Sequence, residues 1–204
     1  MPDFQYETRL GGRVAGVDEV GRGPLAGPVM AAAVVLDPAH IPEGLNDSKK
    51  LSARRRATLC AELEATAAVS VGLASVAEID QINILRATYL AMTRAVAGLP
   101  FKPDHALIDG NFVPHGLAIP ATALVKGDTR SLSIAAASIV AKTRRDALMV
   151  DLAQHNPGYE WEKNKGYPTK AHKLALADLG VTPHHRRSFR PVYNILYQEK
   201  FPTY

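Results

Sequence analysis

The segment VAGVDEVGRGP, residues 14–24, decides how the fold and the function of this chain are interpreted. A short apolar run, typical of a buried strand, ends in two adjacent carboxylates, Asp18 and Glu19, and then enters a glycine-rich loop. Carboxylates at the end of a buried strand are costly to desolvate unless a cation meets them, and hard metal ions prefer such oxygen ligands. Glycines in the loop let a ligand approach the backbone closely. Metal ions beside exposed amides suit phosphodiester hydrolysis, so the segment predicts a nuclease.

Composition limits the classes of protein that fit. The 204-residue chain is 47% hydrophobic and 22% charged, which is enough to bury a globular core. Its single cysteine, Cys60, excludes an intramolecular disulfide and fits a reducing compartment. No run of roughly 20 apolar residues predicts a membrane span, and residues 1–12 lack the apolar stretch of a signal peptide. We therefore expect a cytoplasmic protein with no membrane partner.

Positive charge is concentrated toward the C-terminus. Residues 1–160 contain 16 Lys and Arg against 17 Asp and Glu, whereas residues 161–204 contain 8 against 3. Such a region either binds a polyanion or keeps a helical appendage soluble, and charge alone does not separate these interpretations.

Hydrophobic periodicity predicts an α/β chain. Strands are expected at residues 13–18, 29–36, 69–76, 105–109 and 119–125. Helices are expected at residues 51–65, 78–98, 132–154 and 169–179. The short link between the first two strands predicts an antiparallel hairpin, and the order of elements predicts a mixed sheet. The sequence Asn-Pro-Gly at residues 156–158 breaks the chain, so we expect a domain over residues 1–155 and a basic helical region over residues 156–204 packed against it.

The adjacent acids Asp18 and Glu19 raise a geometric question. Neighbouring strand residues point to opposite faces, so both serve one site only if the strand end is distorted. Gly21 makes such a distortion feasible. Otherwise, one of these two carboxylates would be exposed and the other would form an ion pair.

Three other acids are candidates. Asp109 ends an apolar strand, and neighbouring strands about 4.8 Å apart would let it bracket metal ions with the first pair. It would otherwise be a turn residue before Gly110. Asp128 precedes the long helix, where capping is an equal alternative. Asp146 lies beside two arginines in mid-helix, and we interpret it as an ion-pair partner.

Several polar segments suit phosphate or sugar contacts. Lys49 belongs to the loop NDSKKL, which would either hold phosphate oxygens or form a solvated helix start. Tyr167 lies in a tight loop among lysines, where a ring would either stack on a nucleotide or act as a packing lid. The segment HHRRS at residues 184–188 is basic enough to face phosphates, and its two histidines make a poor zinc site.

A dinucleotide site is a weak alternative for the glycine loop. Residues 21–27 have one residue too many for the Gly-x-Gly-x-x-Gly pattern, and a strand rather than a helix follows them. The preceding carboxylates would also repel a pyrophosphate. An oxidoreductase is therefore disfavoured.

The chain strongly resembles bacterial ribonuclease HII, through motifs that occur in the family's order: GVDEVGRGPLAGPV, GLNDSKKLS, LIDGN, VKGD, IAAASIVAKTRRD, KGYPT and HHRRSF. The resemblance runs from about residue 14 to residue 190 and lacks no element of the pattern. It implies a ribonuclease H fold: a mixed five-stranded sheet flanked by helices, with a small helical C-terminal region. It also implies metal-dependent cleavage of RNA in RNA/DNA hybrids and 5′ of single ribonucleotides in duplex DNA, leaving 3′-hydroxyl and 5′-phosphate ends.

The resemblance assigns the metal-binding acids. The family's four acids fall on Asp18, Glu19, Asp109 and Asp128, which would hold two Mn²⁺ or Mg²⁺ ions for two-metal hydrolysis. This assignment favours Asp128 over Asp146 as the fourth acid.

The resemblance also assigns substrate contacts. Backbone groups of Gly21, Arg22 and Gly23 would recognise the 2′-hydroxyl at the RNA–DNA junction. The family's sugar-stacking tyrosine falls on Tyr167, and Lys49 with the basic C-terminal region would hold the nucleic-acid backbone without sequence preference. The expected partners are RNA/DNA hybrids and duplex DNA containing ribonucleotides, and the expected form is a monomer. A resolvase-like nuclease of the same fold and a non-catalytic hybrid-binding module remain alternatives.

Overall fold

A computed structural model describes residues 1–197; residues 198–204, the end of the expected basic region 156–204, lie outside the described residues. The strands are β1 (Val14–Val20), β2 (Val29–Val35), β3 (Ala68–Ala74), β4 (His105–Asp109) and β5 (Ala121–Leu124). The helices are α1 (Gln5–Leu10), α2 (Ala53–Thr66), α3 (Val76–Ala97), α4 (Leu132–His155), α5 (Trp161–Asn164), α6 (Lys170–Leu179) and α7 (Arg190–Tyr197), with 3₁₀ turns η1 (Ser48–Lys50) and η2 (Gly127–Thr129).

The strands form one mixed sheet in the order β3-β2-β1-β4-β5. β1 pairs antiparallel with β2, as predicted from the short link, and β2 pairs antiparallel with β3. β4 lies parallel to β1, and β5 lies parallel to β4. The carboxyl ends of β1, β4 and β5 therefore meet at one end of the sheet, where open α/β sheets place ligand-binding groups.

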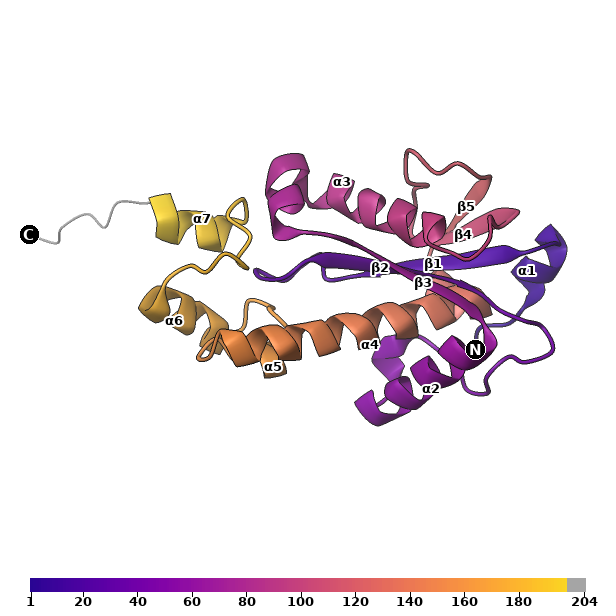
Figure 1. Ribbon diagram of the computed structural model, residues 1–204, viewed down its shortest axis with the longest axis horizontal. Helices are drawn as coiled ribbons and strands as arrows, with labels where there is room; N and C mark the ends of the chain where they lie inside the picture. Colours follow the sequence, from indigo (N-terminus) through magenta and orange to yellow (C-terminus); the bar gives the residue numbers. More distant parts are fainter. Residues whose placement is uncertain (198–204) are drawn as a thin grey trace, which may run out of the picture.

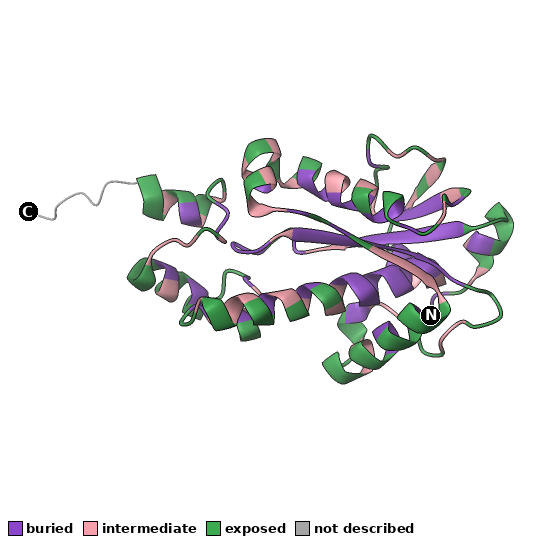
Figure 2. Cartoon of the chain, in the orientation of Figure 1, coloured by how far each residue is buried: buried purple, intermediate pink, exposed green. Residues whose placement is uncertain are grey.

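Helices cover both faces of the sheet. α3 lies on one face, and α2 and α4 lie on the other (Figure 1). Alternate residues of β2 enter the two cores: Ala31 and Ala33 pack toward α3, and Ala32 and Val34 pack toward α2 and α4. Because both faces are covered, every residue of β2 is buried, and the central strands appear as a buried layer in Figure 2. The predicted mixed sheet flanked by helices is confirmed.

One glycine lets α4 lie directly on the sheet. A Cβ atom at Gly16 of β1 would come within 2.0 Å of the carbonyl carbon of Ser133 in α4. The first half of α4 is rich in alanine, and Ala135, Ala136 and Ala137 are fully buried. Small side chains on the helix and none on the strand bring the two backbones together.

Three helices were not predicted: α1, α5 and α7 contain 6, 4 and 8 residues. Helices this short show too few turns for hydrophobic periodicity to reveal them. The predicted helix at 78–98 is interrupted at Asn83, whose φ of 67° is left-handed. The Asn83 side chain then accepts hydrogen bonds from the N–H groups of Leu85 and Arg86 and so starts the second half of α3. None of the described helices combines the length and apolar character that crossing a bilayer demands.

The elements after α4 pack against the loop between β1 and β2. They lie at the far end of α4, beside the β1–β2 turn (Figure 1). The N–H of Leu25 donates a 2.7 Å hydrogen bond to the Gly166 carbonyl, and the N–H of Gly27 donates one of 2.9 Å to the His184 carbonyl. The indole of Trp161 is fully buried in a cluster with Met149 and Ala26. The glycine loop is thus built partly from the C-terminal segment.

Candidate active site

Three acids lie where β1 and β4 end. Asp18 and Glu19 are near the end of β1, and Asp109 is the last residue of β4. The parallel register pairs Val17 with Ile108, so Asp18 and Asp109 follow at the same level on neighbouring strands. Asp18 Oδ1 accepts a 2.8 Å hydrogen bond from the N–H of Glu19, so the Asp18 side chain folds back over its own strand end.

Asp128 joins these acids from η2. The N–H of Gly127 donates a 2.7 Å hydrogen bond to Asp109 Oδ1, which fixes η2 against the end of β4. Asp128 does not cap α4, because the Ser131 hydroxyl accepts the hydrogen bond from the N–H of Ile134 at that helix start. The capping alternative for Asp128 is therefore wrong.

A cavity of about 230 Å³ connects the four acids. Its lining residues come from six segments of the chain: Asp18, Glu19, Val20, Ser48, Lys49, Asp109, Asp128, Ser138, Lys142 and Tyr167. The four predicted acids therefore face the same space as Lys49 and Tyr167. Asp18 and Glu19, although adjacent on one strand, both line this cavity.

Burial and mutual repulsion disfavour ionisation of the acids. Burial raises the pKa of Asp18 well above its usual range, and the charges of Glu19 and Asp109 add to the effect. Burial also raises the pKa of Glu19, although the Arg22 guanidinium, 3.1 Å from Glu19 Oε1, opposes the shift. The pKa of Asp128 is raised first by burial and then by Asp109. A cation in the cavity would oppose these shifts and favour the carboxylate forms.

The donor set fits a hard divalent cation. Four carboxylates around one small cavity supply oxygen ligands, which Mg²⁺ and Mn²⁺ prefer. Within residues 1–197, no three His, Cys, Asp or Glu side chains converge closely enough to hold one ion between them. The four acids thus border one cavity without converging on a single point.

The glycine loop is held from behind by two buried arginines, one from α4 and one from the segment before α7. Arg145 donates to the carbonyls of Pro28 and Lys165 at 3.0 Å and of Ala26 at 3.2 Å. Arg186 donates to the carbonyls of Gly21 at 2.6 Å, Gly27 at 2.9 Å and Arg22 at 3.0 Å.

These two guanidiniums have main-chain rather than carboxylate partners. Both side chains are fully buried, and neither forms an ion pair with a described residue. Burial lowers the pKa of Arg145 to about 10 and of Arg186 to about 9, so both stay protonated at neutral pH. The expectation that residues 184–188 face phosphates is wrong for Arg186, which points inward at the loop.

Tyr167 lies beside the glycine loop at the cavity. A Cβ atom at Gly23 would lie 3.5 Å from Tyr167 Cε1, which is van der Waals contact distance, so the ring lies next to the loop. The Tyr167 side chain is 40% exposed, which argues against a buried packing role. The ring, the loop and the acids therefore border one surface.

Sequence reasoning missed three polar residues of the cavity. Ser48 and Ser138 are buried, and their hydroxyls lie 2.9 Å apart. Lys142 lies four residues after Ser138 on α4, and that spacing is the signal that could have found both. As predicted, Asp146 is an ion-pair partner, 2.8 Å from Lys142 Nζ and 3.9 Å from an Arg56 nitrogen.

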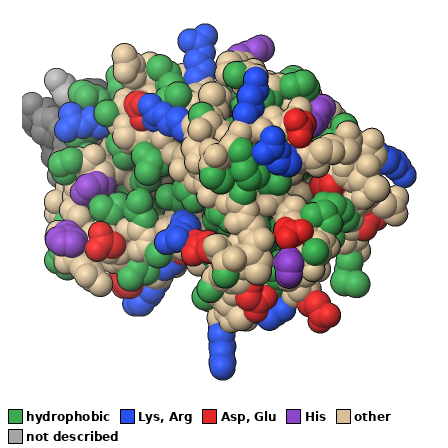
Figure 3. Space-filling model, turned by 45° about the vertical axis from the view of Figure 1, so that its right-hand side comes forward, with side chains coloured by type: hydrophobic (Ala, Val, Ile, Leu, Met, Phe, Trp, Pro, Cys, Tyr) green, Lys and Arg blue, Asp and Glu red, His purple; other side chains and the backbone are tan. Residues whose placement is uncertain are grey.

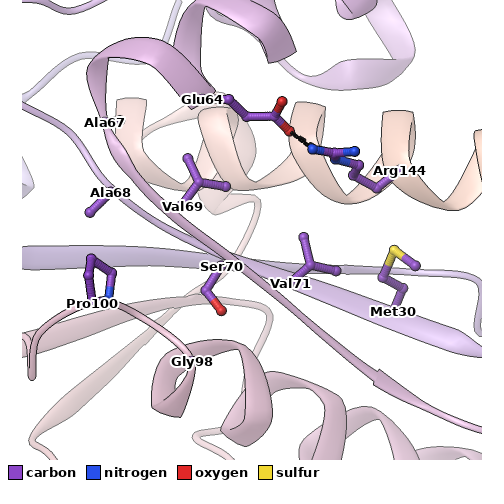
Figure 4. A pocket seen from close by; sticks show the side chains of 10 residues that line it. All are labelled: Met30, Glu64, Ala67, Ala68, Val69, Ser70, Val71, Gly98, Pro100 and Arg144. Atoms are coloured by element: carbon purple, nitrogen blue, oxygen red, sulfur yellow. Dashed lines mark hydrogen bonds and ion pairs between the residues drawn. The ribbon is translucent and has the colours of Figure 1, made fainter.

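A larger cavity lies elsewhere. It measures about 780 Å³ and follows the free edge of β3, where Ser70 and Val71 line it (Figure 4). Its charged groups, Glu64 and Arg144, neutralise each other through a hydrogen bond of 2.8 Å. On the face displayed in Figure 3, cationic and anionic side chains are interspersed and form no continuous field. The acidic cavity is therefore the better candidate for chemistry.

A mixed five-stranded sheet with acids at the ends of its first and fourth strands defines a nuclease of the ribonuclease H-like class. The profile of the family described as Ribonuclease HII matches residues 15–192, and the chain belongs to this family. It is therefore a hydrolase, an endoribonuclease of the ribonuclease H type 2 class, which acts on nucleic acid.

Individual relatives agree with this membership. The chain is 68% identical to ribonuclease HII of Ruegeria pomeroyi over 98% of its own length and 87% of that protein. It is similar to the crystal structure of ribonuclease H2 from Pyrococcus horikoshii, with a TM-score of 0.75 and 28% identity over 90% of this chain and 96% of that chain. A structure of Bst-RNase HIII in complex with Mn²⁺ shares the fold, with a TM-score of 0.75 and 20% identity over 93% of this chain and 71% of that chain.

Proposed function

We propose that this enzyme cuts the RNA strand of RNA/DNA hybrids and cuts 5′ of single ribonucleotides in duplex DNA, leaving 3′-hydroxyl and 5′-phosphate ends. One observation carries the proposal: four acids, Lys49 and Tyr167 line one cavity beside the glycine loop. Groups that hydrolyse the backbone and groups that read a sugar would then contact the same few nucleotides.

Asp18, Glu19, Asp109 and Asp128 would hold two divalent cations, Mn²⁺ or Mg²⁺. When bound, the cations would neutralise the cavity, activate a water molecule and stabilise the leaving 3′-oxygen. The Mn²⁺ complex of Bst-RNase HIII supports this choice of metal. Since burial raises the pKa of Asp18, Glu19 and Asp128, these groups would lose protons as the cations bind, and occupancy would fall with falling pH.

The glycine loop would recognise the 2′-hydroxyl through two N–H groups. The C=O and N–H of one peptide unit point in opposite directions. Because the carbonyls of Gly21 and Arg22 point at Arg186, the N–H groups of Arg22 and Gly23 point away from it. Neither N–H donates to another described residue. Both would be available to the 2′-hydroxyl, the group that separates RNA from DNA.

Tyr167 would stack on the sugar of the deoxynucleotide that follows the ribonucleotide. Its partial exposure beside Gly23 supports this contact. Lys49 and the basic region 156–204 would hold phosphates beside a catalytic domain over residues 1–155, giving salt-sensitive binding without sequence preference. We further propose that the enzyme works as a monomer in the cytoplasm, where chromosomal DNA would present ribonucleotides.

A substrate panel tests the proposal. With Mg²⁺ or Mn²⁺, we expect cleavage of an RNA/DNA hybrid and of duplex DNA with one ribonucleotide, and none of all-DNA duplex. Cleavage of a DNA four-way junction would instead indicate a resolvase-like activity. Binding of the hybrid without cleavage in either metal would indicate a binding module.

A further inference from the structure

We propose that His172 is a positioning residue that holds the Tyr167 loop through a hydrogen bond from His172 Nδ1 to the Tyr167 carbonyl. The inference rests on the proposed role of Tyr167 at the RNA–DNA junction. It concerns a group outside the acidic cavity, since His172 does not line that cavity.

His172 belongs to a buried chain of hydrogen bonds that ends at Tyr167. His172 and His185 are 0% and 1% exposed, and their Nε2 atoms lie 3.1 Å apart. The Trp161 indole N–H donates a 3.0 Å hydrogen bond to His172 Nε2. The N–H of Thr182 donates one of 3.0 Å to His185 Nδ1. His172 Nδ1 lies 2.9 Å from the Tyr167 carbonyl oxygen.

Two N–H donors, from Trp161 and Thr182, determine which ring nitrogens carry protons. An indole N–H and a backbone N–H can only donate, so the ring nitrogens that they meet must accept. His185 Nδ1 is therefore unprotonated, and His185 carries its proton on Nε2, facing His172. His172 Nε2 is likewise unprotonated, which leaves the His172 proton on Nδ1. That proton is aimed at the Tyr167 carbonyl, which can only accept.

The surroundings keep both rings neutral. Tyr159 and His184 are the other titratable side chains near the pair: Tyr159 lies edge-on to both rings, and His184 packs edge-on against Trp161. No Asp or Glu among residues 1–197 forms an ion pair with either ring. Burial lowers the pKa of His172, and burial followed by repulsion from His172 lowers the pKa of His185 to about 4.

The bond to the carbonyl matters because the Tyr167 ring is positioned through its backbone. The ring is 40% exposed, so packing alone does not fix it. Its carbonyl accepts hydrogen bonds from His172 and from the N–H of Thr169 at 2.8 Å. Removing the His172 donor would leave the loop free to shift, and a shift on the order of 1 Å is enough to lower turnover strongly.

A double-mutant cycle tests the coupling between His172 and Tyr167. His172→Phe fills the space without donating, and Tyr167→Ala removes the ring. On duplex DNA with one ribonucleotide, we expect His172→Phe to lower kcat roughly 3- to 10-fold while KM changes less than about twofold. In the Tyr167→Ala background the same change should have almost no further effect, because its target is gone.

Two further variants separate positioning from packing. His172→Asn places an amide N–H near the Nδ1 position, and it should recover most of the lost kcat. His155→Phe makes the same substitution at an exposed histidine of α4 whose ring bonds the Asp151 carbonyl and not Tyr167, and it should leave kcat unchanged. Full loss in His172→Asn, or an equal loss in His155→Phe, would overturn the inference.

The outcomes distinguish this inference from the proposed function. If Tyr167→Ala leaves cleavage at the ribonucleotide unchanged, the proposed role of Tyr167 fails. If Tyr167→Ala lowers it but the two losses add in the double variant, the inference fails and the proposed function stands.

Nitrogen-15 NMR of the wild-type imidazoles gives a test that needs no variant. Protons on His172 Nδ1 and His185 Nε2 are expected, and the opposite tautomer of His172 would contradict the inference.

Discussion

Arg186 and Gly21 lie 165 positions apart in the sequence, and Nη2 of Arg186 donates a 2.6 Å hydrogen bond to the Gly21 carbonyl. The bond joins the segment before α7 to the loop that follows β1. The same guanidinium bonds the carbonyls of Arg22 and Gly27. A residue from the segment before α7 therefore supports the shape of the glycine loop.

Replacing this arginine should destabilise the fold. Arg186→Gln removes a buried charge and leaves main-chain acceptors without their donors, so we expect a loss of about 2–3 kcal/mol in the free energy of unfolding. Arg187→Gln is the matched control, because Arg187 is exposed; its effect should stay within about 0.5 kcal/mol. Chemical denaturation of both variants measures the difference. If the two variants were equally stable, the hydrogen bonds from Arg186 to the loop carbonyls would contribute little to stability.

Asp18→Asn should abolish cleavage without unfolding the protein. The amide keeps the size of the carboxylate but removes a charge that the metals would need, so we expect turnover to fall at least about 10²–10³-fold. Apo stability should not decrease, because burial and repulsion raise the pKa of Asp18 and oppose its ionised form. Cleavage assays with saturating Mn²⁺ check this, with Asp146→Asn as control. If Asp146→Asn proved as inactive as Asp18→Asn, Asp146 would be a metal ligand and not only an ion-pair partner.

The Tyr167 ring should matter for the rate of cleavage at a single ribonucleotide more than for duplex affinity. Tyr167→Ala should slow cutting at a single ribonucleotide roughly tenfold, while Tyr167→Phe keeps the stacking face and most of the activity. Tyr193→Ala removes another ring that is exposed but does not line the cavity, and it should have no effect. Kinetics on the single-ribonucleotide duplex, together with duplex binding by anisotropy, separate the two effects. An equal loss of affinity and turnover would indicate a packing role.

The buried histidines predict how stability depends on pH. The folded chain binds a proton on His185 less tightly than the unfolded chain does, because the pKa of His185 is lowered to about 4. Its contribution to stability is therefore complete above the unfolded pKa of about 6.5 and is lost as the pH falls toward 4. Relative to His185→Gln, which does not titrate, the wild type should lose up to about 3 kcal/mol between pH 7 and pH 4. Parallel stability curves for the two proteins would contradict this.

Most of the fold could be predicted from the sequence, because its core elements have strong hydrophobic patterns. β2 is a continuous apolar run, and α4 is long enough for its apolar residues to recur over several turns. The short helix α5 and the left-handed Asn83 within α3 could not be predicted, since tertiary contacts rather than periodicity determine them. Strand ends placed Asp18 and Asp109, whereas the resemblance to the family was needed to prefer Asp128.

The sequence did not predict the buried residues that hold the glycine loop in place. A run of arginines predicts an exposed basic surface, since charged residues are rarely buried without a charged partner. Arg145 and Arg186 are buried because main-chain carbonyls from a distant loop meet them, and that pairing exists only in the folded chain. The proton arrangement between His172 and His185 likewise depends on which ring nitrogens the Trp161 indole and the Thr182 N–H meet, and only the folded chain determines those contacts.

The central claim is that one metal-dependent site reads a 2′-hydroxyl and cuts beside it. The most direct test is an end-labelled DNA duplex with one ribonucleotide, incubated with Mn²⁺, Mg²⁺ or EDTA and resolved to single nucleotides. We predict one metal-dependent cut immediately 5′ of the ribonucleotide, with a 3′-hydroxyl on one product and a 5′-phosphate on the other. A cut 3′ of the ribonucleotide, or one that persists in EDTA, would contradict the account.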